Sequence, residues 1–149
     1  MTRQNERLNE KFDLLFVPHP SGSLPAHNRS DELYLTWDVM FGENYNKEKR
    51  AIVIPDIGVY FIYVRLTLKC QDEDAMFKRF YVALHKWNEG YNITQLLTDA
   101  WDGIVCTPGG LRSVFVGQLF DLLEGDHVMV WIGKGYELIM KSSFGAYLT

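Results

Sequence analysis

Short runs of apolar residues, separated by turn-forming residues, recur along most of the chain. Runs rich in β-branched and aromatic residues that alternate with polar ones are typical of strands. The breaks between the runs carry Gly, Pro, Asn and Asp, and no amphipathic helical pattern is long enough to cover a sheet. The pattern predicts an all-β sandwich or jelly roll of two antiparallel sheets. We expect strands at residues 12–17, 33–37, 51–54, 59–70, 77–87, 93–101, 111–122, 127–132 and 143–148.

Two stretches near the start of the chain do not fit the strand pattern. Residues 1–10 are polar and are predicted to be a flexible leader, which leaves residues 11–149 as one domain. Residues 19–32 are rich in Pro, Ser, Gly and Asn, which predicts a long exposed loop. Loops of this length in compact domains are usually functional.

The expected strand at 59–70 is apolar on both faces. Successive side chains of a strand point to opposite faces, and a sheet with one solvated face should alternate apolar and polar residues. Here one face carries Tyr60, Ile62, Val64, Leu66 and Leu68, and the other carries Val59, Phe61 and Tyr63. The second face therefore needs an explanation beyond the core of a single sandwich.

The strands at 111–122 and 143–148 repeat this anomaly, through Phe115, Gly117 and Leu119 in the first and Tyr147 in the second. A monomer that exposed all of these rings would carry an unusually large apolar patch. Burial in a subunit interface is the simplest resolution. The alternative is that loops or the N-terminal strand cover the face. The rings concerned are those of Phe61, Tyr63, Phe115 and Tyr147.

Composition supports a globular domain and excludes several partners. The 149 residues are 47% apolar, 14% aromatic and 23% charged, which is enough to form a core. The net charge of −4 gives no reason to approach phosphate backbones, so we expect no nucleic-acid partner. The longest apolar stretch, 59–68, contains Arg65 and is far shorter than the about 20 residues that span a bilayer, so this chain should not insert into a membrane.

Catalytic and metal-binding patterns are not evident in the sequence. The four histidines His19, His27, His85 and His127 are scattered, without zinc-ligand spacing. There is no nucleophile elbow and no phosphate-binding glycine loop, and the acidic run at 72–74 lacks the spacing of a calcium loop. We expect no enzyme activity, no metal and no cofactor.

Cysteines and sequons bear on the cellular compartment. Cys70 and Cys106 allow one intramolecular disulfide, and the alternative is two buried free thiols. Asn28-Arg29-Ser30 and Asn92-Ile93-Thr94 fit the N-glycosylation pattern, which shifts the balance toward a disulfide in an extracellular protein. Residues after Met1 do not resemble a signal peptide, so a targeting segment would lie outside this chain.

Four segments together resemble the tumour necrosis factor (TNF) superfamily of ligands. Residues 55–63 (PDIGVYFIY) resemble its Gly-x-Tyr-x-Ile-Tyr strand, and 115–126 (FVGQLFDLLEGD) resemble its aromatic-Leu-Gly-x-x-Phe-x-Leu-x-x-Gly-Asp strand and turn. Residues 143–148 resemble its closing strand, and Trp37 its early tryptophan. The order and spacing match over about residues 33–149. The cysteine placement and residues 94–97 (TQLL) resemble the subgroup of Fas ligand, LIGHT and the vascular endothelial growth inhibitor.

The resemblance implies a jelly-roll domain that assembles as a homotrimer and binds TNF-receptor-type receptors outside the cell. Such ligands are usually displayed on, or released from, type II membrane anchors. The resemblance places Phe61, Tyr63, Phe115 and Tyr147 around the three-fold axis. Ser143 stands where the family often has an aromatic residue, which implies looser packing at one end of the axis.

The family resemblance also implies where receptors bind, which is in the grooves between neighbouring subunits. Tyr91 occupies the place of a recurrent receptor contact, and Trp87 lies in the same loop. The alternative for Tyr91 is a solvated turn residue, and the alternative for Trp87 is a core residue at the end of a strand. A glycan on Asn92 would stand beside Tyr91, so either that sequon is unused or the loop binds in a different way. Loops 19–32 and 133–141 would supply the further contacts Arg29, Tyr136 and Glu137.

Two other functions remain open at this point. A lectin-like jelly roll could stack sugars on Trp87, Tyr91 and Trp101. A C1q-like trimeric recognition head has a similar architecture, but would normally follow a collagen-like stem, and its Gly-x-y repeat is not in this sequence. A cupin-type enzyme is least favoured, because it needs clustered histidines.

Overall fold

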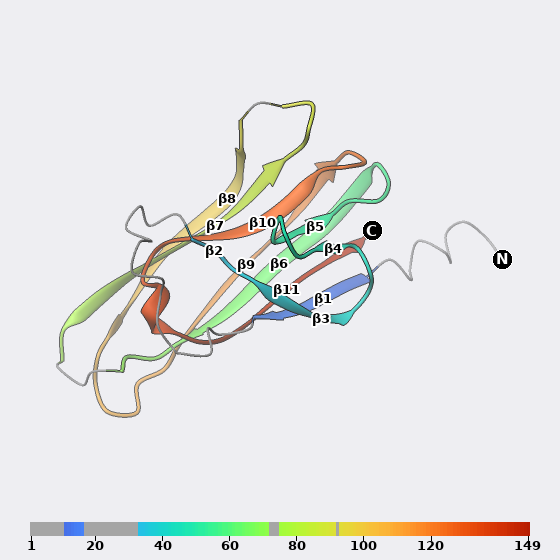
Figure 1. Ribbon diagram of the computed structural model, residues 1–149. Helices are drawn as coiled ribbons and strands as arrows, with labels where there is room; N and C mark the ends of the chain where they lie inside the picture. Colours follow the sequence, from blue (N-terminus) through green and yellow to red (C-terminus); the bar gives the residue numbers. More distant parts are fainter. Residues whose placement is uncertain (1–10, 17–32, 72–74, 92) are drawn as a thin grey trace.

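The computed structural model of the chain describes residues 11–16, 33–71, 75–91 and 93–149. In these residues the chain forms two antiparallel sheets that pack face to face (Figure 1). One 3-10 turn, η1 (Tyr136–Leu138), is the only helical element in the same ranges. The strands are β1 (Lys11–Phe16), β2 (Leu33–Tyr34), β3 (Trp37–Phe41), β4 (Tyr45–Asn46), β5 (Ala51–Val53), β6 (Gly58–Leu68), β7 (Phe77–Trp87), β8 (Gln95–Val105), β9 (Arg112–Leu122), β10 (His127–Lys134) and β11 (Ile139–Leu148).

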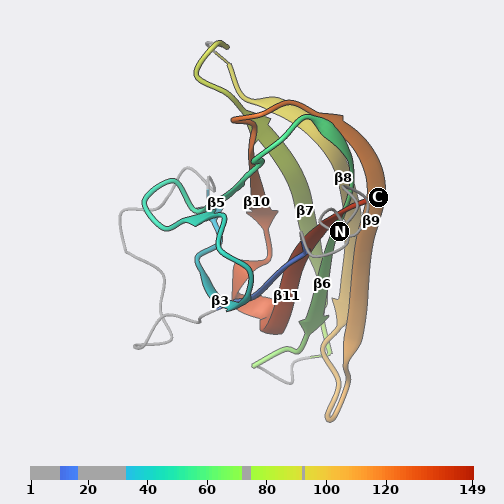
Figure 2. The same cartoon turned by 90° about the vertical axis from the view of Figure 1, so that its right-hand side faces the viewer.

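The strand order confirms the predicted jelly-roll sandwich. One sheet has five strands in the order β3-β1-β11-β6-β9. The other has six, in the order β4-β5-β10-β7-β8, with β2 also pairing with β10. The edge strands β8 and β9 follow each other in the chain but belong to different sheets, so the sandwich has one side that is bordered by both (Figure 2).

The core lies between the sheets and uses one face of each long strand. From β6 the predicted inward face is fully buried, with an exposed fraction of 0% for Tyr60, Ile62, Val64, Leu66 and Leu68. The facing positions of β7, Phe80, Val82 and Leu84, are also 0% exposed. Burying each such side chain contributes about 1.5–3 kcal/mol. The outward face of β6 has no part in this core.

Some strand boundaries differ from the prediction. The expected strand at 33–37 is two strands, because Leu35 donates its N–H to the Val130 carbonyl at 3.0 Å in one sheet, while Trp37 begins β3 in the other. β8 starts later and ends later than expected, since its ladder with β7 continues to the Phe77–Val105 pair. The expected 133–141 loop is short, because β10 continues to Lys134 through a bulge and β11 begins at Ile139.

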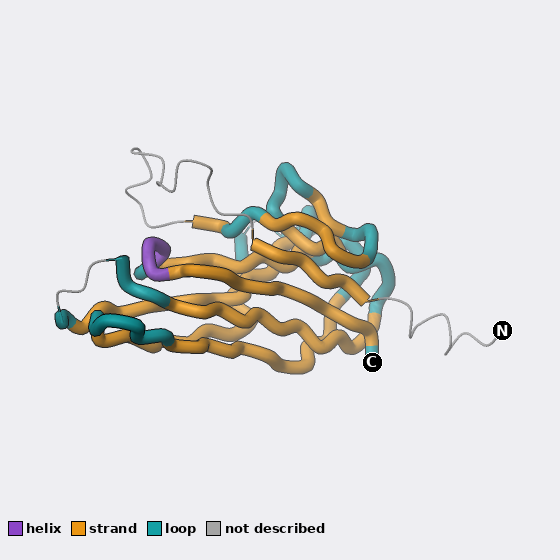
Figure 3. Tube along the Cα trace, turned by 90° about the horizontal axis from the view of Figure 1, so that it is seen from below, coloured by secondary structure: helices purple, strands orange, loops and turns teal. Residues whose placement is uncertain are grey.

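The long strands run the length of the molecule, and the loops gather at its two ends (Figure 3). One end, called here the Tyr91 end, carries the β7–β8 loop and the β9–β10 turn. The other, called the disulfide end, carries η1 and the β6–β7 and β8–β9 loops. At this end Cys70 is disulfide-bonded to Cys106, with their Cα atoms 5.4 Å apart. Of the two possibilities that the sequence left open, a disulfide or two buried free thiols, the structure has the disulfide. Within the described ranges, no helix is long and apolar enough to cross a membrane.

Candidate self-association face and binding loops

The four aromatic residues predicted to surround a symmetry axis lie together on the outward face of the five-stranded sheet. Phe61 is directly opposite Tyr147 of β11, and Tyr63 is directly opposite Gly117 of β9. Residues directly opposite each other in an antiparallel ladder project from the same face. Phe115 is two residues from Gly117 on β9 and therefore shares this face. We call the outward surface of Phe61, Tyr63, Phe115 and Tyr147 the aromatic face.

The rings of the aromatic face contact one another in a continuous row. The Tyr147 and Phe61 centroids are 5.4 Å apart, those of Phe61 and Tyr63 are 6.2 Å apart, and those of Tyr63 and Phe115 are 6.5 Å apart. These separations lie in the range in which aromatic pairs attract each other. The row crosses three adjacent strands, β11, β6 and β9, so it forms a surface rather than an isolated contact.

This face is open in the single chain. Phe115 is 56% exposed and Tyr147 is 40% exposed, and the neighbouring Leu119 is 54% exposed. β1 pairs with the edge of β11 and extends the sheet sideways, so it does not lie over the rings. The alternative in which the N-terminal strand covers the face is therefore wrong for the described residues.

Charged residues stand at the two ends of the aromatic face. Arg65 lies opposite both Phe115 and Ser143 and is exposed. Asp121 lies opposite Val59 at the Tyr91 end and is exposed too. An apolar centre with a polar rim is the usual anatomy of a protein interface. The face has this anatomy along the direction of β6.

The two residues predicted in the β7–β8 loop occupy different surroundings. Tyr91 is 37% exposed, and its backbone N–H donates to the Asn88 carbonyl at 2.8 Å. Trp87 is half-buried at the end of β7, where its ring lies edge-on to that of His127 at 5.0 Å. The Lys49 ammonium lies 5.4 Å from the Trp87 ring centroid, within cation–π range. Both residues lie at the Tyr91 end and are accessible to a partner.

A buried carboxylate, which sequence reasoning did not select as a site, organises this end. Asp126 is 0% exposed, and its side chain accepts hydrogen bonds from the Leu123 N–H at 2.8 Å and from the Asn88 side-chain amide at 2.9 Å. The side-chain oxygen of Asn88 in turn accepts the Gly90 N–H at 3.1 Å. The Gly-Asp pair of the 115–126 motif was a signal for this turn, but not for its contact with the β7–β8 loop.

The other predicted receptor contacts lie at the opposite end. Tyr136 in η1 is half-buried and packs on the core, and burial raises the pKa of its hydroxyl above 10.0. Glu137 beside it is exposed. The eight residues of β10 separate this end from the Tyr91 end, a span of about 25 Å. One chain therefore does not bring all these residues together. Arg29 and both sequon asparagines, Asn28 and Asn92, lie outside the described residues.

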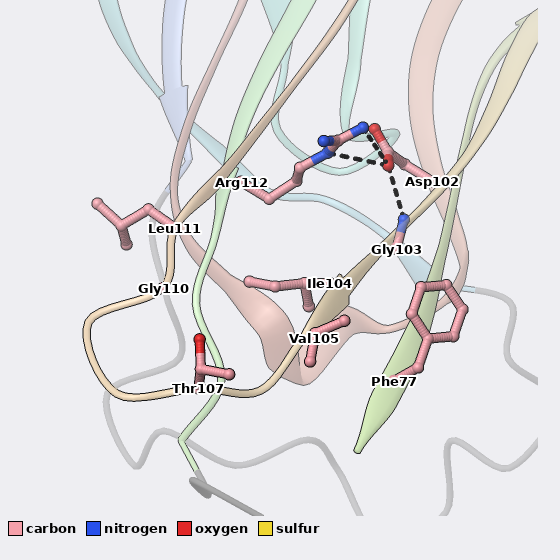
Figure 4. A pocket seen from close by; sticks show the side chains of 9 residues that line it. All are labelled: Phe77, Asp102, Gly103, Ile104, Val105, Thr107, Gly110, Leu111 and Arg112. Atoms are coloured by element: carbon pink, nitrogen blue, oxygen red, sulfur yellow. Dashed lines mark hydrogen bonds and ion pairs between the residues drawn. The ribbon is translucent and has the colours of Figure 1, made fainter. Parts of the chain in front are cut away.

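A pocket of about 630 Å³ lies at the disulfide end, on the side bordered by β8 and β9 (Figure 4). Its polar centre is an ion pair, in which the Arg112 guanidinium lies 3.0 Å from an oxygen of Asp102. The pair links the two sheets across their edges. The remaining lining residues are Phe77, Gly103, Ile104, Val105, Thr107, Gly110 and Leu111. Sequence reasoning missed the pocket because its residues meet only when the two edge strands lie side by side.

The outward face of the six-stranded sheet carries a second row of rings, called here the outer ladder. Its members are Trp101, Tyr81, Trp131, His85 and Tyr34, with successive centroids 4.5, 5.7, 5.2 and 5.6 Å apart. Trp101 is 62% exposed and lies in the middle of β8, opposite Tyr81. It is therefore not grouped with Trp87 and Tyr91, as the lectin alternative assumed.

Polar groups of the outer ladder are engaged with each other. The Tyr81 hydroxyl donates to the Asp99 carboxylate at 2.5 Å, and desolvation together with this bond raises the pKa of Tyr81 to about 12. The Tyr34 hydroxyl lies 2.9 Å from Nδ1 of His85, whose pKa burial lowers below 6.5. Among the residues that the structure describes, no three His, Cys, Asp or Glu side chains gather to hold a metal ion.

Comparison with known proteins agrees with this architecture. The model of the TNF (Tumour Necrosis Factor) family matches residues 34–149. Tumor necrosis factor ligand superfamily member 15 of Rattus norvegicus is 26% identical over 152 residues, which cover 89% of this chain and 57% of the relative. Member 6 of Felis catus is 24% identical over 131 residues, which cover 85% of this chain and 45% of the relative. Member 6 of Sus scrofa has the same identity and coverage.

The chain thus spans about half the length of the curated relatives it matches. Member 6 is Fas ligand, so the comparison also agrees with the subgroup that the sequence resembled.

Proposed function

The chain belongs to the TNF family, and from this premise we propose that it is an extracellular cytokine ligand that forms a homotrimer and clusters TNF-receptor-type receptors. Members of the family are cytokines, so the chain is not an enzyme. Assembly and receptor binding are the parts of the proposal that the geometry must support.

The aromatic face is the observation that carries the proposal. A row of rings that are up to 56% exposed needs a partner, because aromatic side chains bury large apolar areas and dominate the energetics of interfaces. The family resemblance assigns the partner as two further copies around a three-fold axis. Such an interface is heterologous and closes into a ring, which limits the assembly to three chains. The axis residues would be Phe61, Tyr63, Phe115 and Tyr147.

The separation of the loop residues supports a receptor that lies along the molecule. Tyr91 and Trp87 lie at one end, and Tyr136 and Glu137 lie at the other, about 25 Å away along β10. An elongated receptor in the groove between two subunits would reach both ends, and Arg29 belongs to the same proposed surface. Three equivalent grooves would gather three receptors, and this multivalency strengthens attachment on a cell surface without new contacts.

The proposed location is outside the cell, as the ectodomain of a type II membrane protein that is displayed or released. The disulfide between Cys70 and Cys106 supports this, because disulfides persist in oxidising compartments. Use of the Asn28 and Asn92 sequons belongs to the same proposal, and a mass shift on treatment with an N-glycosidase would test it; a glycan found on Asn92 would mean that the loop meets the receptor in a different way than through Tyr91. The domain of this ligand would be residues 11–149, after a leader at 1–10.

The test combines assembly and binding. Sedimentation equilibrium of the chain at micromolar concentration should give the mass of three chains, and immobilised TNF-receptor-type ectodomains should capture that species. A stable monomer would contradict the role of the aromatic face. A trimer that binds no member of a complete receptor panel would contradict the receptor role.

Carbohydrate binding is a second candidate, and the outer ladder favours it. Trp101 presents a ring that is 62% exposed, and the Asp99 carboxylate beside it can accept hydrogen bonds from sugar hydroxyls. Binding of the chain to a glycan array, with loss of the signal in Trp101→Ala, would establish this activity. An array without signal would remove it.

A further inference from the structure

The β7–β8 loop is tied to a different part of the chain through one side chain. Asn88 is the first residue after β7, and its amide nitrogen donates to the buried Asp126 carboxylate of the β9–β10 turn at 2.9 Å. We propose that Asn88 is a positioning residue that transfers the fixed position of Asp126 to Tyr91. The inference rests on the proposed function, since that function assigns Tyr91 a receptor.

Asp126 is a rigid anchor. It is 0% exposed, and its backbone N–H donates to the Leu123 carbonyl at 3.0 Å while its carbonyl accepts from the Ile54 N–H at 2.8 Å. One carboxylate oxygen accepts from the Leu123 N–H at 2.8 Å, and the other accepts from Asn88. A buried carboxylate is costly unless it is hydrogen-bonded, so these bonds hold it in place. Asn88 is the donor that comes from outside the turn and its neighbouring strand.

The anchor fixes which way the Asn88 amide points. A carboxylate only accepts hydrogen bonds, so the NH₂ group must face Asp126, and the amide oxygen then faces the loop. This oxygen accepts the Gly90 N–H at 3.1 Å, and the backbone carbonyl of Asn88 accepts the Tyr91 N–H at 2.8 Å. Two consecutive loop amides are therefore held by one residue, directly before the ring that is proposed to meet the receptor.

The β9–β10 turn is shaped to receive Asn88. Gly125 has a φ of 86°, a left-handed conformation that favours glycine, and a Cβ there would lie 3.4 Å from the Asn88 amide nitrogen. The Gly125 carbonyl accepts a hydrogen bond from Nδ1 of His127 at 2.8 Å, and the His127 ring packs against Trp87. The same turn thus supports both residues proposed to contact the receptor.

The hydrogen bonds of Asn88 lower the entropy that the β7–β8 loop loses when a receptor binds. A loop that is already ordered loses less conformational freedom when a partner binds, so its affinity is higher for the same contacts. Replacing Asn88 with alanine removes the amide and leaves the Tyr91 ring unchanged. Binding should weaken about tenfold through the lost order alone.

A double-mutant cycle tests whether Asn88 acts through Tyr91. Asn88→Ala should lower the affinity for a TNF-receptor-type ectodomain in the wild-type background, and should lower it no further in a Tyr91→Ala background. Tyr60→Phe is the matched control, because it removes a 2.8 Å side-chain hydrogen bond to the Asp56 carbonyl, which lies outside the β7–β8 loop. An equal loss in the Tyr91→Ala background, or with Tyr60→Phe, would overturn the proposal.

Amide hydrogen exchange tests the same idea without a receptor. In Asn88→Ala the amides of Gly90 and Tyr91 should exchange at least about tenfold faster than in the wild type, whereas Tyr60→Phe should leave them unchanged. If the wild-type chain binds no ectodomain, the proposed function fails, and the exchange rates still decide whether Asn88 holds the loop. Unchanged exchange at Tyr91 would overturn the positioning role, because the Gly90 amide loses its side-chain acceptor in any case whereas the Tyr91 amide keeps the backbone carbonyl of residue 88.

Discussion

The ring of Tyr63 is stacked on the ring of Phe115 from the neighbouring strand, with centroids 6.5 Å apart and ring planes 16° apart. The β9 residue opposite Tyr63 is Gly117. A Cβ at Gly117 would lie 2.8 Å from the Phe115 ring and 2.9 Å from the Phe61 ring. The missing side chain at Gly117 therefore allows three rings from two strands to form one surface.

Gly117→Ala should weaken self-association while leaving the fold intact. The added methyl group must displace the exposed Phe115 ring, so the cost falls on the shape of the aromatic face rather than on the core. We expect about tenfold weaker assembly, measured as the concentration at which trimers dissociate in sedimentation equilibrium. Gly90→Ala is the control, because the nearest atom to a Cβ there is 3.9 Å away. Equal behaviour of the two variants would contradict this account of Gly117.

Phe115→Asp should abolish assembly. A carboxylate without a partner in a dry interface costs several kcal/mol, more than one ring contact contributes. Phe77→Asp is a closely matched control, because Phe77 is 61% exposed against 56% for Phe115 but lies on the other sheet. Sedimentation velocity should show monomers for the first variant and unchanged assembly for the second. Trimers in Phe115→Asp would place the interface elsewhere.

The sequence predicted the aromatic face because the evidence was local. An outward face with Phe61 and Tyr63 is visible as a departure from alternation within one strand, and the register of β6 with β9 and β11 then aligned the other rings. The long strands were also found, because each pairs along its whole length with a neighbour and follows the period of two. The strand at 33–37 was not divided correctly, since the switch between sheets depends on the bond from Leu35 to Val130 in a distant strand.

The loop sites were less accessible to sequence reasoning. The resemblance selected Tyr91, but nothing local indicates that Asn88 contacts Asp126, because the contact depends on how two loops fold back at the same end. The outer ladder was missed for a similar reason, since Tyr81, Trp131 and His85 become neighbours only through the β7–β10 register. Contacts between strands depend on register, and register is a property of the whole sheet.

Tyr91→Ala should weaken receptor binding and leave assembly unchanged. Large rings at the centre of an interface typically contribute about 2 kcal/mol or more, which corresponds to an affinity about 30 times weaker. Trp101→Ala serves as the control, because it removes an exposed ring from the outer ladder instead. The measurement is surface plasmon resonance with an immobilised ectodomain. Joint loss of binding and of the trimer would show that Tyr91 is structural.

The stability of the fold should fall in mild acid through His85. Burial lowers the pKa of His85 in the folded chain below the 6.5 of the unfolded one, so the unfolded state takes up a proton first. The stability that the neutral His85 ring gives the fold is complete above about pH 6.5 and is lost as the pH falls toward the folded-state pKa. His85→Phe keeps a ring between Tyr34 and Trp131 but cannot titrate.

The measurement is the melting temperature at about pH 7.5 and about pH 5, since a histidine in the unfolded chain changes its charge between these values. The melting temperature of the wild type should fall further on acidification than that of His85→Phe. His127 and the carboxylates are common to both chains, so the difference between the two losses isolates His85. Equal losses would show that the His85 ring is as easily protonated in the folded chain as in the unfolded one.

Removal of the disulfide should destabilise the fold without changing its topology. The bridge joins residues 36 positions apart in sequence, and closing a loop of that length contributes roughly 3–4 kcal/mol on the chain-entropy model. The Cys70→Ala/Cys106→Ala double variant should therefore unfold at a lower urea concentration. Two backbone hydrogen bonds still hold the two loops together, from the Ala75 N–H to the Cys106 carbonyl at 2.8 Å and from the Cys106 N–H to the Met76 carbonyl at 2.9 Å, so the disulfide end should keep its shape.

Because assembly links stability to concentration, both chains must be compared at the same concentration. Reductant provides the control: it should lower the wild-type midpoint to that of the double variant and leave the variant unchanged. A double variant as stable as the oxidised wild type would show that the bridge adds nothing to the bonds already present.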